Sequence, residues 1–440
     1  MNIKLISPHQ QRQDCISSAD QFKIQKVSLP LIAALTPTGH NIKIVDEAFA
    51  PDIPDEDVDL VGITVMTHLA SRAYQIAKTY RQHGAKVVLG GIHPTVLPDE
   101  AIHHADTIVL GEAEEIWPTL VKDASLGKLK KIYQSTKLTD LSLLPIPRRN
   151  LYPSLKSRNY SPTCVGIETS RGCPFDCEFC SINLIAGKKY RSRPILEIVA
   201  EIESIQSPYL FFVDDSLALN PIKAKKLFTE MAPFKKQWIG EGTATIAHDL
   251  ELLRLMKNSG CKGLLIGFES VDKNVQKSMD KTNILQISYS EVIRRFHDEG
   301  IPIYGSFVFG FDYETKEVFN RTLDFIMSLR MDGASLRILC PYPGTRFYKR
   351  LLRENRLIEP KWWLKGYADG MLLFRPKQMT PDTFIKSLNL MIKQFYSFKG
   401  IIHRFFGISP WKRSALGCIY YIGVNFANRK RYYKGVETSI

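Results

Sequence analysis

Short apolar runs alternate with stretches of helical periodicity in two separate parts of the chain. In the first part, apolar runs predict strands at Ile3–Ser7, Asn41–Val45, Leu60–Met66, Lys86–Leu89 and Thr107–Leu110. Between the third and fourth run, apolar residues at helical spacing predict a helix over Ser71–His83 that ends at Gly84. This alternation favours a parallel sheet covered by helices on both faces, so we expect a Rossmann-like, doubly wound α/β domain over residues 1–138.

The second part repeats the order strand then helix. Strands are predicted at Val165–Thr169, Leu210–Val213, Trp238–Thr243, Gly263–Phe268, Ile303–Phe309 and Ser335–Leu339. The helices that follow them are predicted to begin near Pro194, Pro221, Asp249, Ile284, Thr315 and Thr345. A closed barrel of eight such units takes about 250 residues, so the shorter span 161–352 predicts a partial (β/α)6 TIM-like barrel with its chemistry on the loops after the strands.

Two other segments complete the predicted organisation. Residues 139–160 contain Pro145, Pro147 and Pro153 and show no periodicity, which is typical of a linker between domains. From residue 353 to residue 440 the strand pattern stops, and helical spacing with aromatic clusters predicts a small helical C-terminal region.

Composition narrows the class of protein. Of the 440 residues, 44% are hydrophobic and 24% are charged, which excludes disorder or a fibre as the description of the whole chain. No apolar run reaches the ~18 residues that cross a bilayer, and the segment that starts at Met1 lacks the pattern of a secretory signal. We therefore expect a cytoplasmic location.

The charge of the chain is positive and unevenly spread. The net charge is +14, and residues 391–440 hold nine Lys or Arg and one acid, Glu437. Such a basic segment can meet nucleic acid, an anionic membrane surface or only solvent. The chain shows no RNA-binding motif, so no nucleic-acid partner is expected. Aromatic residues among the basic ones leave a peripheral membrane contact open.

Three of the eight cysteines, Cys173, Cys177 and Cys180, stand in a C-x3-C-x2-C run directly after the first predicted barrel strand. Three thiolates suit a 4Fe–4S cluster that keeps one iron free of protein ligands. A structural zinc would need a distant fourth ligand, and a redox site of the thioredoxin type uses two cysteines rather than three. A 4Fe–4S cluster on these three residues is therefore the favoured metal centre.

Small and polar residues gather at the predicted carboxyl ends of the strands in the first domain, where parallel sheets bind ligands. Glycines there allow the backbone to approach a bulky ligand, although tight turns would explain them equally well. The candidate residues at this edge are Thr67, Gly90, Gly91, His93, Gly111 and Glu112.

The cysteine loop, with Phe179 directly before its last cysteine, resembles the loop of the radical S-adenosylmethionine (SAM) enzymes. The N-terminal sheet is similar to the cobalamin-binding domain that precedes the barrel in one large subgroup of that family. The resemblance covers nearly the whole chain, in the family's order. Beside the cysteine loop it is carried by residues 90–95, 111–114, 144–149, 212–215, 267–270, 309–312 and 341–345.

The resemblance implies a cobalamin-dependent radical SAM enzyme. In this family a 4Fe–4S cluster cleaves SAM reductively to a 5′-deoxyadenosyl radical, and methyl-cobalamin supplies a methyl group, so methylation of an unactivated carbon is the expected reaction. Cyclisation, oxidation or rearrangement with the same cofactors is the alternative, and a non-catalytic iron–sulfur protein is a third. The expected partners are a small-molecule substrate, for which an apolar character is one option, and an external electron donor of the flavodoxin or ferredoxin type.

The resemblance also implies roles for single residues. Asp214 and Asp215, at the end of the second barrel strand, are expected to take the ammonium of SAM, with a helix cap as the alternative. Glu269 is expected to accept from the ribose hydroxyls, with a solvated loop carboxylate as the alternative. Further SAM contacts are expected from Phe179, Thr243 and Ser306.

The chain lacks the D-x-H-x-x-G motif, whose histidine replaces the lower ligand of cobalt in many cobalamin proteins. Cobalamin is therefore expected to bind in a base-off form with no protein histidine on cobalt. His68 and His93 lie at the predicted edge of the first sheet, and neither is assigned as a ligand.

Overall fold

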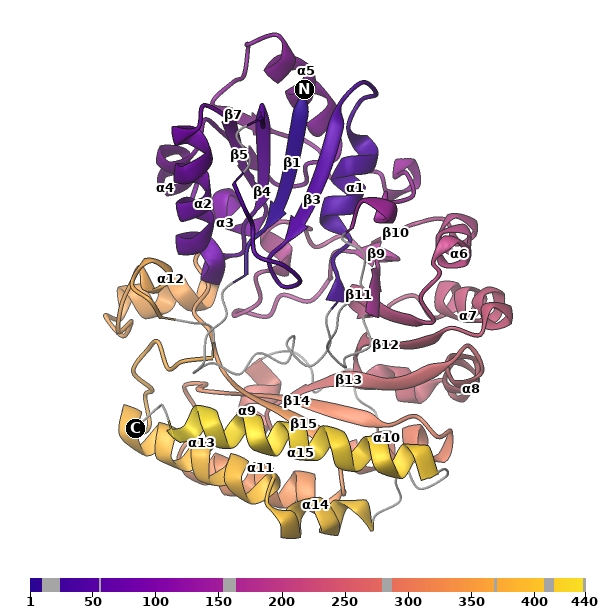
Figure 1. The fold of residues 1–440 in the computed structure, drawn as a ribbon. Coiled ribbons are helices and arrows are strands. Elements are labelled where there is room, and N and C mark those ends of the chain that lie inside the picture. The colour runs from indigo at the N-terminus through magenta and orange to yellow at the C-terminus, as the bar shows by residue number, and fades with distance from the viewer. Residues whose placement is uncertain are drawn as a thin grey trace.

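The computed structural model describes residues 1–9, 24–54, 57–152, 164–278, 287–367, 370–406 and 415–437. It contains two parallel sheets that helices cover, followed by a helical C-terminal part (Figure 1). The predicted α/β fold class is thereby confirmed.

The N-terminal sheet has six parallel strands in the order β3-β1-β4-β5-β6-β7. Their bounds are β1 (Asn2–Ser7), β3 (Asn41–Asp46), β4 (Leu60–Thr64), β5 (Lys86–Gly90), β6 (Thr107–Leu110) and β7 (Ile132–Gln134). The predicted strands are confirmed, and β7 is additional. Its three residues are too few to show a period in the sequence.

Helices cover both faces of this sheet. One face packs against α1 (Ser28–Leu35) and α5 (Trp117–Ser125). The other packs against α2 (Ala70–Gln82), with the short helices α3 (Ile92–Val96) and α4 (Pro98–Ala101) beside it. Helix α2 confirms the predicted helix. The sequence did not predict α1, because this helix is apolar almost all round and shows no amphipathic period.

The second sheet has seven strands in the order β15-β14-β13-β12-β11-β8-β2, all parallel. Their bounds are β2 (Ile24–Gln25), β8 (Cys164–Ile167), β11 (Tyr209–Leu217), β12 (Gln237–Gly242), β13 (Cys261–Glu269), β14 (Ile303–Phe309) and β15 (Gly333–Ile338). The predicted partial barrel is confirmed. Strand β2 is an addition from the predicted first domain, so the predicted boundary does not separate the two sheets.

Helices line the outer side of the partial barrel. They are α6 (Ile195–Ser204), α7 (Pro221–Met231), α8 (Leu250–Asn258), α9 (Lys273–Ser278), α10 (Tyr289–Asp298), α11 (Glu317–Ser328) and α12 (Arg346–Arg353). The predicted helix start near Ile284 lies outside the described residues. Strands β9 (Ser170–Arg171) and β10 (Arg191–Ser192) form a separate antiparallel pair around the cysteine loop.

Successive side chains of each barrel strand face alternately the covering helices and the barrel interior. The Phe212 ring lies 6.3 Å from the ring of Phe228 on α7 and 5.0 Å from that of Trp238, centroid to centroid. Phe309 stacks on Phe319 of α11. These positions therefore face outward to the helices, and the residues between them face the barrel interior.

The C-terminal part consists of α13 (Pro381–Phe395), α14 (Phe398–Phe405) and α15 (Ala415–Glu437). Figure 1 shows these helices beside the β15 end of the barrel sheet, away from the N-terminal sheet. The buried guanidinium of Arg404 on α14 donates to the backbone oxygens of Met331 and Asp332, which fixes α14 to the segment before β15. Within the described residues, no helix is long and apolar enough to cross a membrane.

Candidate active site between the two sheets

The three cysteines lie in a loop that starts directly after β9. Cys173, Cys177 and Cys180 are all half-buried. Burial raises the pKa of the Cys180 thiol to about 11, and the neighbouring Cys177 and Cys173 add to this shift. The three thiols are thus close enough to feel one another's charge. Gly172 opens the loop with a φ of 85°, and a Cβ atom there would lie 2.4 Å from the Lys189 carbonyl oxygen.

This donor set fits the cluster that the sequence predicts. Soft thiol ligands on one loop suit an iron–sulfur cluster better than oxygen-preferring ions. Among the described residues, no three His, Cys, Asp or Glu side chains are already arranged around one point as a metal site. Ligation by Cys173, Cys177 and Cys180 therefore stays a prediction.

The neighbouring carboxylates Asp214 and Asp215 have different surroundings. Asp214 is buried and accepts hydrogen bonds from Thr169 Oγ1 at 2.6 Å and Ser170 Oγ at 2.6 Å. Burial raises its pKa to about 6. These bonds hold its carboxylate against the segment before the cysteines. A contact of Asp214 with the SAM ammonium stays a prediction. Asp215 is half-buried and accepts from the Gly172 backbone N–H at 3.0 Å, at the start of the cysteine loop.

The barrel interior holds a group of charged residues that the sequence reading missed in part. Glu269 ends β13 with a φ of 62°, a conformation that non-glycine residues rarely adopt. Glu241 on β12 is exposed to the open interior of the barrel. The surrounding protein raises its pKa by limiting its hydration, with Glu269 and Asp215 as further contributors, while Arg337 on β15 lowers it. Three carboxylates and one guanidinium therefore share this interior. The sequence did contain a sign that Glu241 belongs to this group. Glu241 stands two residues before the predicted contact Thr243, so both side chains are expected on the same face of the chain.

The other predicted SAM contacts lie around the same interior. Thr243 Oγ1 is 2.6 Å from Thr245 Oγ1, just after β12. Ser306 is half-buried on β14, paired with Gly267 of β13. The Phe179 ring lies 5.8 Å from the Phe311 ring, edge to face. Their contacts with SAM remain predictions.

A buried carboxylate braces the loops after β13 and β14. Glu314 accepts from Ser270 Oγ at 2.7 Å and from the backbone N–H groups of Gly310 at 2.8 Å and Phe311 at 3.1 Å. Burial raises its pKa to about 7. Because Ser270 follows Glu269, these bonds also fix the backbone that carries the Glu269 side chain into the barrel. Sequence reasoning missed Glu314, since a loop glutamate gives no sign of burial.

The loop after β6 in the N-terminal domain touches the cysteine loop. Glu112 pairs with Arg171 at 3.2 Å and with Arg191 at 2.7 Å, and it accepts from the Thr139 backbone N–H at 2.7 Å. Glu114 pairs with Arg171 at 2.6 Å. Arginines from the barrel thus engage the Glu112 carboxylate, and its contact with a cofactor stays a prediction. The carboxyl ends of the two sheets consequently face each other.

The glycine edge of the N-terminal sheet fits a large ligand. Gly91 has a φ of 98°, and a Cβ atom there would lie 3.0 Å from the Val65 carbonyl oxygen. Gly111 has a φ of 78°, and a Cβ atom there would meet nothing within 4 Å, so its surroundings are open. Gly90 ends β5, and Thr67 is buried at the start of a short 3₁₀ helix. These four residues remain candidates for contact with cobalamin.

His93 follows this edge in the short helix α3. Its side chain is fully buried, with Nε2 at 2.7 Å from the Tyr74 hydroxyl and 3.5 Å from the Glu100 carboxylate. Trp363, in the segment between α12 and α13, packs against it and donates to Glu100 at 2.8 Å. This packing between α2 and the Trp363 segment encloses the ring, and a contact of His93 with cobalamin stays a prediction. His68 is half-buried in the 3₁₀ helix after β4.

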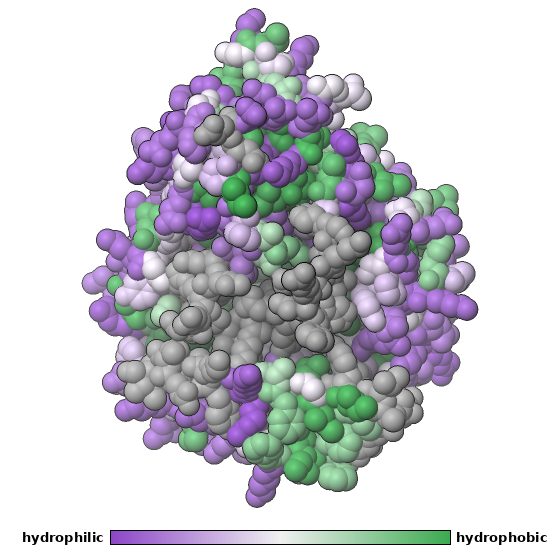
Figure 2. Space-filling view, viewed as in Figure 1, coloured by the Kyte–Doolittle hydropathy of each residue, from purple (hydrophilic) through white to green (hydrophobic). Residues whose placement is uncertain are grey.

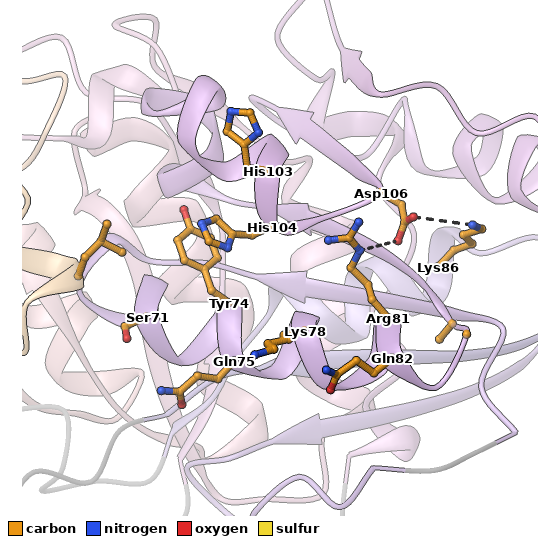
Figure 3. Close-up of a pocket in the computed structure, with 13 residues that line it drawn as sticks. Ser71, Tyr74, Gln75, Lys78, Arg81, Gln82, Lys86, His103, His104 and Asp106 are labelled. Carbon is orange, nitrogen blue, oxygen red and sulfur yellow. Dashed lines mark ion pairs between the residues drawn. The ribbon is translucent and has the colours of Figure 1, made fainter.

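A separate open pocket of about 740 Å³ lies along α2 (Figure 3). Tyr74 stacks on His104 there with 3.7 Å between ring centroids, and Arg81 and Lys86 pair with Asp106. None of the predicted site residues lines this pocket. The candidate active site therefore lies with the predicted residues, at the facing carboxyl ends of the two sheets.

Two segments of the chain match known families. Residues 167–326 match the radical SAM superfamily, and residues 19–121 match the B12 binding domain. Bacteriochlorophyllide d C-12(1)-methyltransferase of Chlorobaculum tepidum is 30% identical over 395 residues, which span 87% of this chain and 85% of that protein. The chain belongs to the cobalamin-dependent radical SAM methyltransferases. The predicted cofactors, a 4Fe–4S cluster, SAM and cobalamin, are confirmed with the family.

Two further comparisons agree with this assignment. Bacteriochlorophyllide d C-8(2)-methyltransferase of the same organism is 30% identical over 404 residues, 88% of each chain. The solved structure of TsrM, a radical SAM methyltransferase from Kitasatospora setae, covers 100% of both chains with a TM-score of 0.69 at 16% identity, which confirms the fold. Methylation is thus favoured over the cyclisation, oxidation or rearrangement that the sequence left open.

Proposed function

We propose that this enzyme methylates an unactivated carbon of an apolar small molecule held between its two sheets. The observation that supports this most is the position of Arg171, two residues before Cys173. Its guanidinium pairs with Glu112 and Glu114, which lie in the loop after β6. A methyl donor on one sheet edge and a radical source on the other must reach the same carbon, and this contact brings the two edges together.

Within this proposal the chain's own residues have distinct tasks. Cys173, Cys177 and Cys180 hold the cluster, and Asp215 and Glu269 bind SAM from the barrel side. When bound, the three cofactors supply the electron, the deoxyadenosyl radical and the methyl group. Thr67, Gly90, Gly91 and Gly111 line the cobalamin edge, while Asp214 and Glu314 keep the loops in shape and exclude water from them.

The apolar character of the substrate is supported by the barrel interior. Phe211, Val213, Leu265 and Val308 stand on the inward-facing positions of the strands and are half-buried. Both named relatives act on bacteriochlorophyllide d, and we propose an acceptor that is likewise apolar over most of its surface. Glu241 and Arg337 then offer one charged anchor for a polar group of that acceptor.

The electron is proposed to come from an acidic donor of the flavodoxin or ferredoxin type, in the cytoplasm. Lys188, Lys189 and Arg346 are exposed beside the cysteine loop. Lys188 and Arg346 both approach Asp176, which neutralises only part of their charge. A negatively charged donor fits this surface.

Anaerobic assays of the reconstituted full chain test the proposed function. With SAM, a low-potential reductant and an apolar acceptor, we expect 5′-deoxyadenosine, S-adenosylhomocysteine and an acceptor that is heavier by one methylene. Cys177→Ala should abolish 5′-deoxyadenosine, whereas Cys418→Ala on α15 should leave it unchanged. Equal 5′-deoxyadenosine from Cys177→Ala and the wild type would overturn the assignment of the cysteine loop.

A further inference from the structure

Helices α14 and α15 expose a continuous apolar surface at the end of the molecule away from the N-terminal sheet. Figure 2 shows the hydrophobic colour gathered over these two helices. The side chains concerned are between 38% and 67% exposed. This apolar patch consists of Phe398, Ile402 and Phe406 from the α14 segment and Ile419, Ile422 and Phe426 from α15.

The patch is not a remnant of incomplete packing, because each helix buries its opposite face. On α14, Ile401 and Arg404 are buried, and Arg404 Nη2 donates to Asn425 Oδ1 of α15 at 3.0 Å. On α15, Tyr421, Asn425 and Asn428 are buried. The outward positions are therefore held outward by a docked helix pair, and their exposure is a fixed property of the surface.

Contacts across the two helices make the patch one surface. The Phe398 and Phe426 rings lie 5.3 Å apart, and the Arg429 guanidinium lies 4.3 Å from the centroid of the Phe398 ring. Patches of this kind on a folded protein mark sites of interaction rather than ordinary solvent-exposed surface.

Positive charge borders the patch. Lys399 and Lys430 are exposed beside it, and Arg429 borders it. The sequence from residue 391 to residue 436 contains no Asp or Glu, and residues 391–440 hold nine Lys or Arg. Two copies that met through this face would bring these cations together, so charge disfavours a dimer here.

We propose that the apolar patch docks on an anionic lipid surface. Apolar side chains would enter the interface between headgroups and acyl chains, and the Lys and Arg fringe would meet the lipid phosphates. The contact is peripheral, in keeping with the absence of a membrane-spanning helix among the described residues. It does not depend on the identity of the methyl acceptor.

Flotation of the full-length holoenzyme with lipid vesicles tests the proposal. The wild type should float with phosphatidylglycerol-containing vesicles, float less at high salt, and stay unbound with pure phosphatidylcholine. Phe398→Ser/Ile402→Ser should reduce the bound fraction about tenfold or more, because both the apolar area and its depth are lost. Lys399→Gln/Lys430→Gln should weaken binding to the anionic vesicles alone.

Leu196→Ser/Ile222→Ser is the matched control, since these residues are 74% and 82% exposed on α6 and α7, outside the patch. It should float like the wild type, and circular dichroism melts should show all variants folded. The charge variant removes no packing, so its result stands even if the serine variant unfolds. Failure of the wild type to float, or equal loss of binding in the control, would overturn the proposal. A dimer in light scattering that Phe398→Ser/Ile402→Ser dissolves would assign the patch to a second copy instead.

Discussion

At the scale of single residues, Glu314 links the pH to the stability of the barrel mouth. Its pKa of about 7 lies above the ordinary value of 4.5, because burial disfavours the charged form. Between these two values the folded state holds a proton that the unfolded chain has released. The free energy of unfolding should therefore fall as pH rises from about 4.5 to about 7, by an amount on the order of 3 kcal/mol.

Glu314→Gln tests this link directly. The amide resembles the protonated acid: its oxygen accepts from Gly310 and Phe311, and its NH₂ donates to Ser270 Oγ. Urea unfolding at pH 5 and pH 8 should show that the variant lacks this pH-dependent loss of stability. The same slope in the variant and the wild type would mean that the proton is held elsewhere.

The environment of cobalt is a second question at this scale. His93 is fully buried against Tyr74 and Glu100, so it cannot serve as the lower ligand without breaking that packing. The electron paramagnetic resonance spectrum of the cob(II)alamin state should show no nitrogen superhyperfine splitting. Splitting that disappears in His68→Ala or His93→Ala would contradict the expectation of a base-off cofactor without a protein histidine.

The residue scale also shows what the sequence alone could reach. The cysteine spacing was sufficient for the cluster prediction, since three thiols within eight residues leave few other uses. The sequence could not show that Asp214 and Asp215 have different surroundings. Asp214 accepts from the hydroxyls of Thr169 and Ser170, which lie next to it only in the folded chain. The burial of Glu314 could not be predicted for the same reason, since its hydrogen-bond partners come from two loops.

At the scale of elements, the cysteine loop depends on a glycine. Gly172→Ala would place a Cβ atom 2.4 Å from the Lys189 carbonyl oxygen at a φ of 85°. We expect the loop to shift and the iron content after anaerobic reconstitution to drop several-fold. Gly127→Ala is the matched control: its φ is 69°, but nothing lies within 4 Å, so it should cost only about 1 kcal/mol of stability and leave iron unchanged.

Wild-type iron content in Gly172→Ala would show that the loop can relax around the added methyl group.

Elements themselves were predictable where their period was long, as for α2 and the barrel strands. Strand β2, with two residues, was not, because it forms only through pairing with β8. Helix α9 was missed in a similar way, since its six residues carry too short a pattern.

At the scale of the whole molecule, a buried ion-pair group joins the two sheets. Glu112 binds Arg171 and Arg191, and removal of its carboxylate would leave buried guanidinium groups without that partner. Glu112→Ala is expected to cost about 3–5 kcal/mol. Calorimetry should then show the two parts unfolding in separate transitions. Glu115→Ala, at an exposed position, is the control and should unfold with the same calorimetric profile as the wild type. A wild-type profile in Glu112→Ala would contradict the view that this ion-pair group joins the two sheets.

The central claim is that one chain carries an iron–sulfur cluster on Cys173, Cys177 and Cys180 and cobalamin on a separate sheet edge. The most direct measurement is the iron, sulfide and cobalamin content of the anaerobically reconstituted chain, beside a variant with all three cysteines changed to alanine. We predict about four iron atoms and one cobalamin per wild-type chain, and loss of the iron alone in the variant. Iron retained in the variant, stoichiometric zinc, or a wild type without cobalamin would contradict the account.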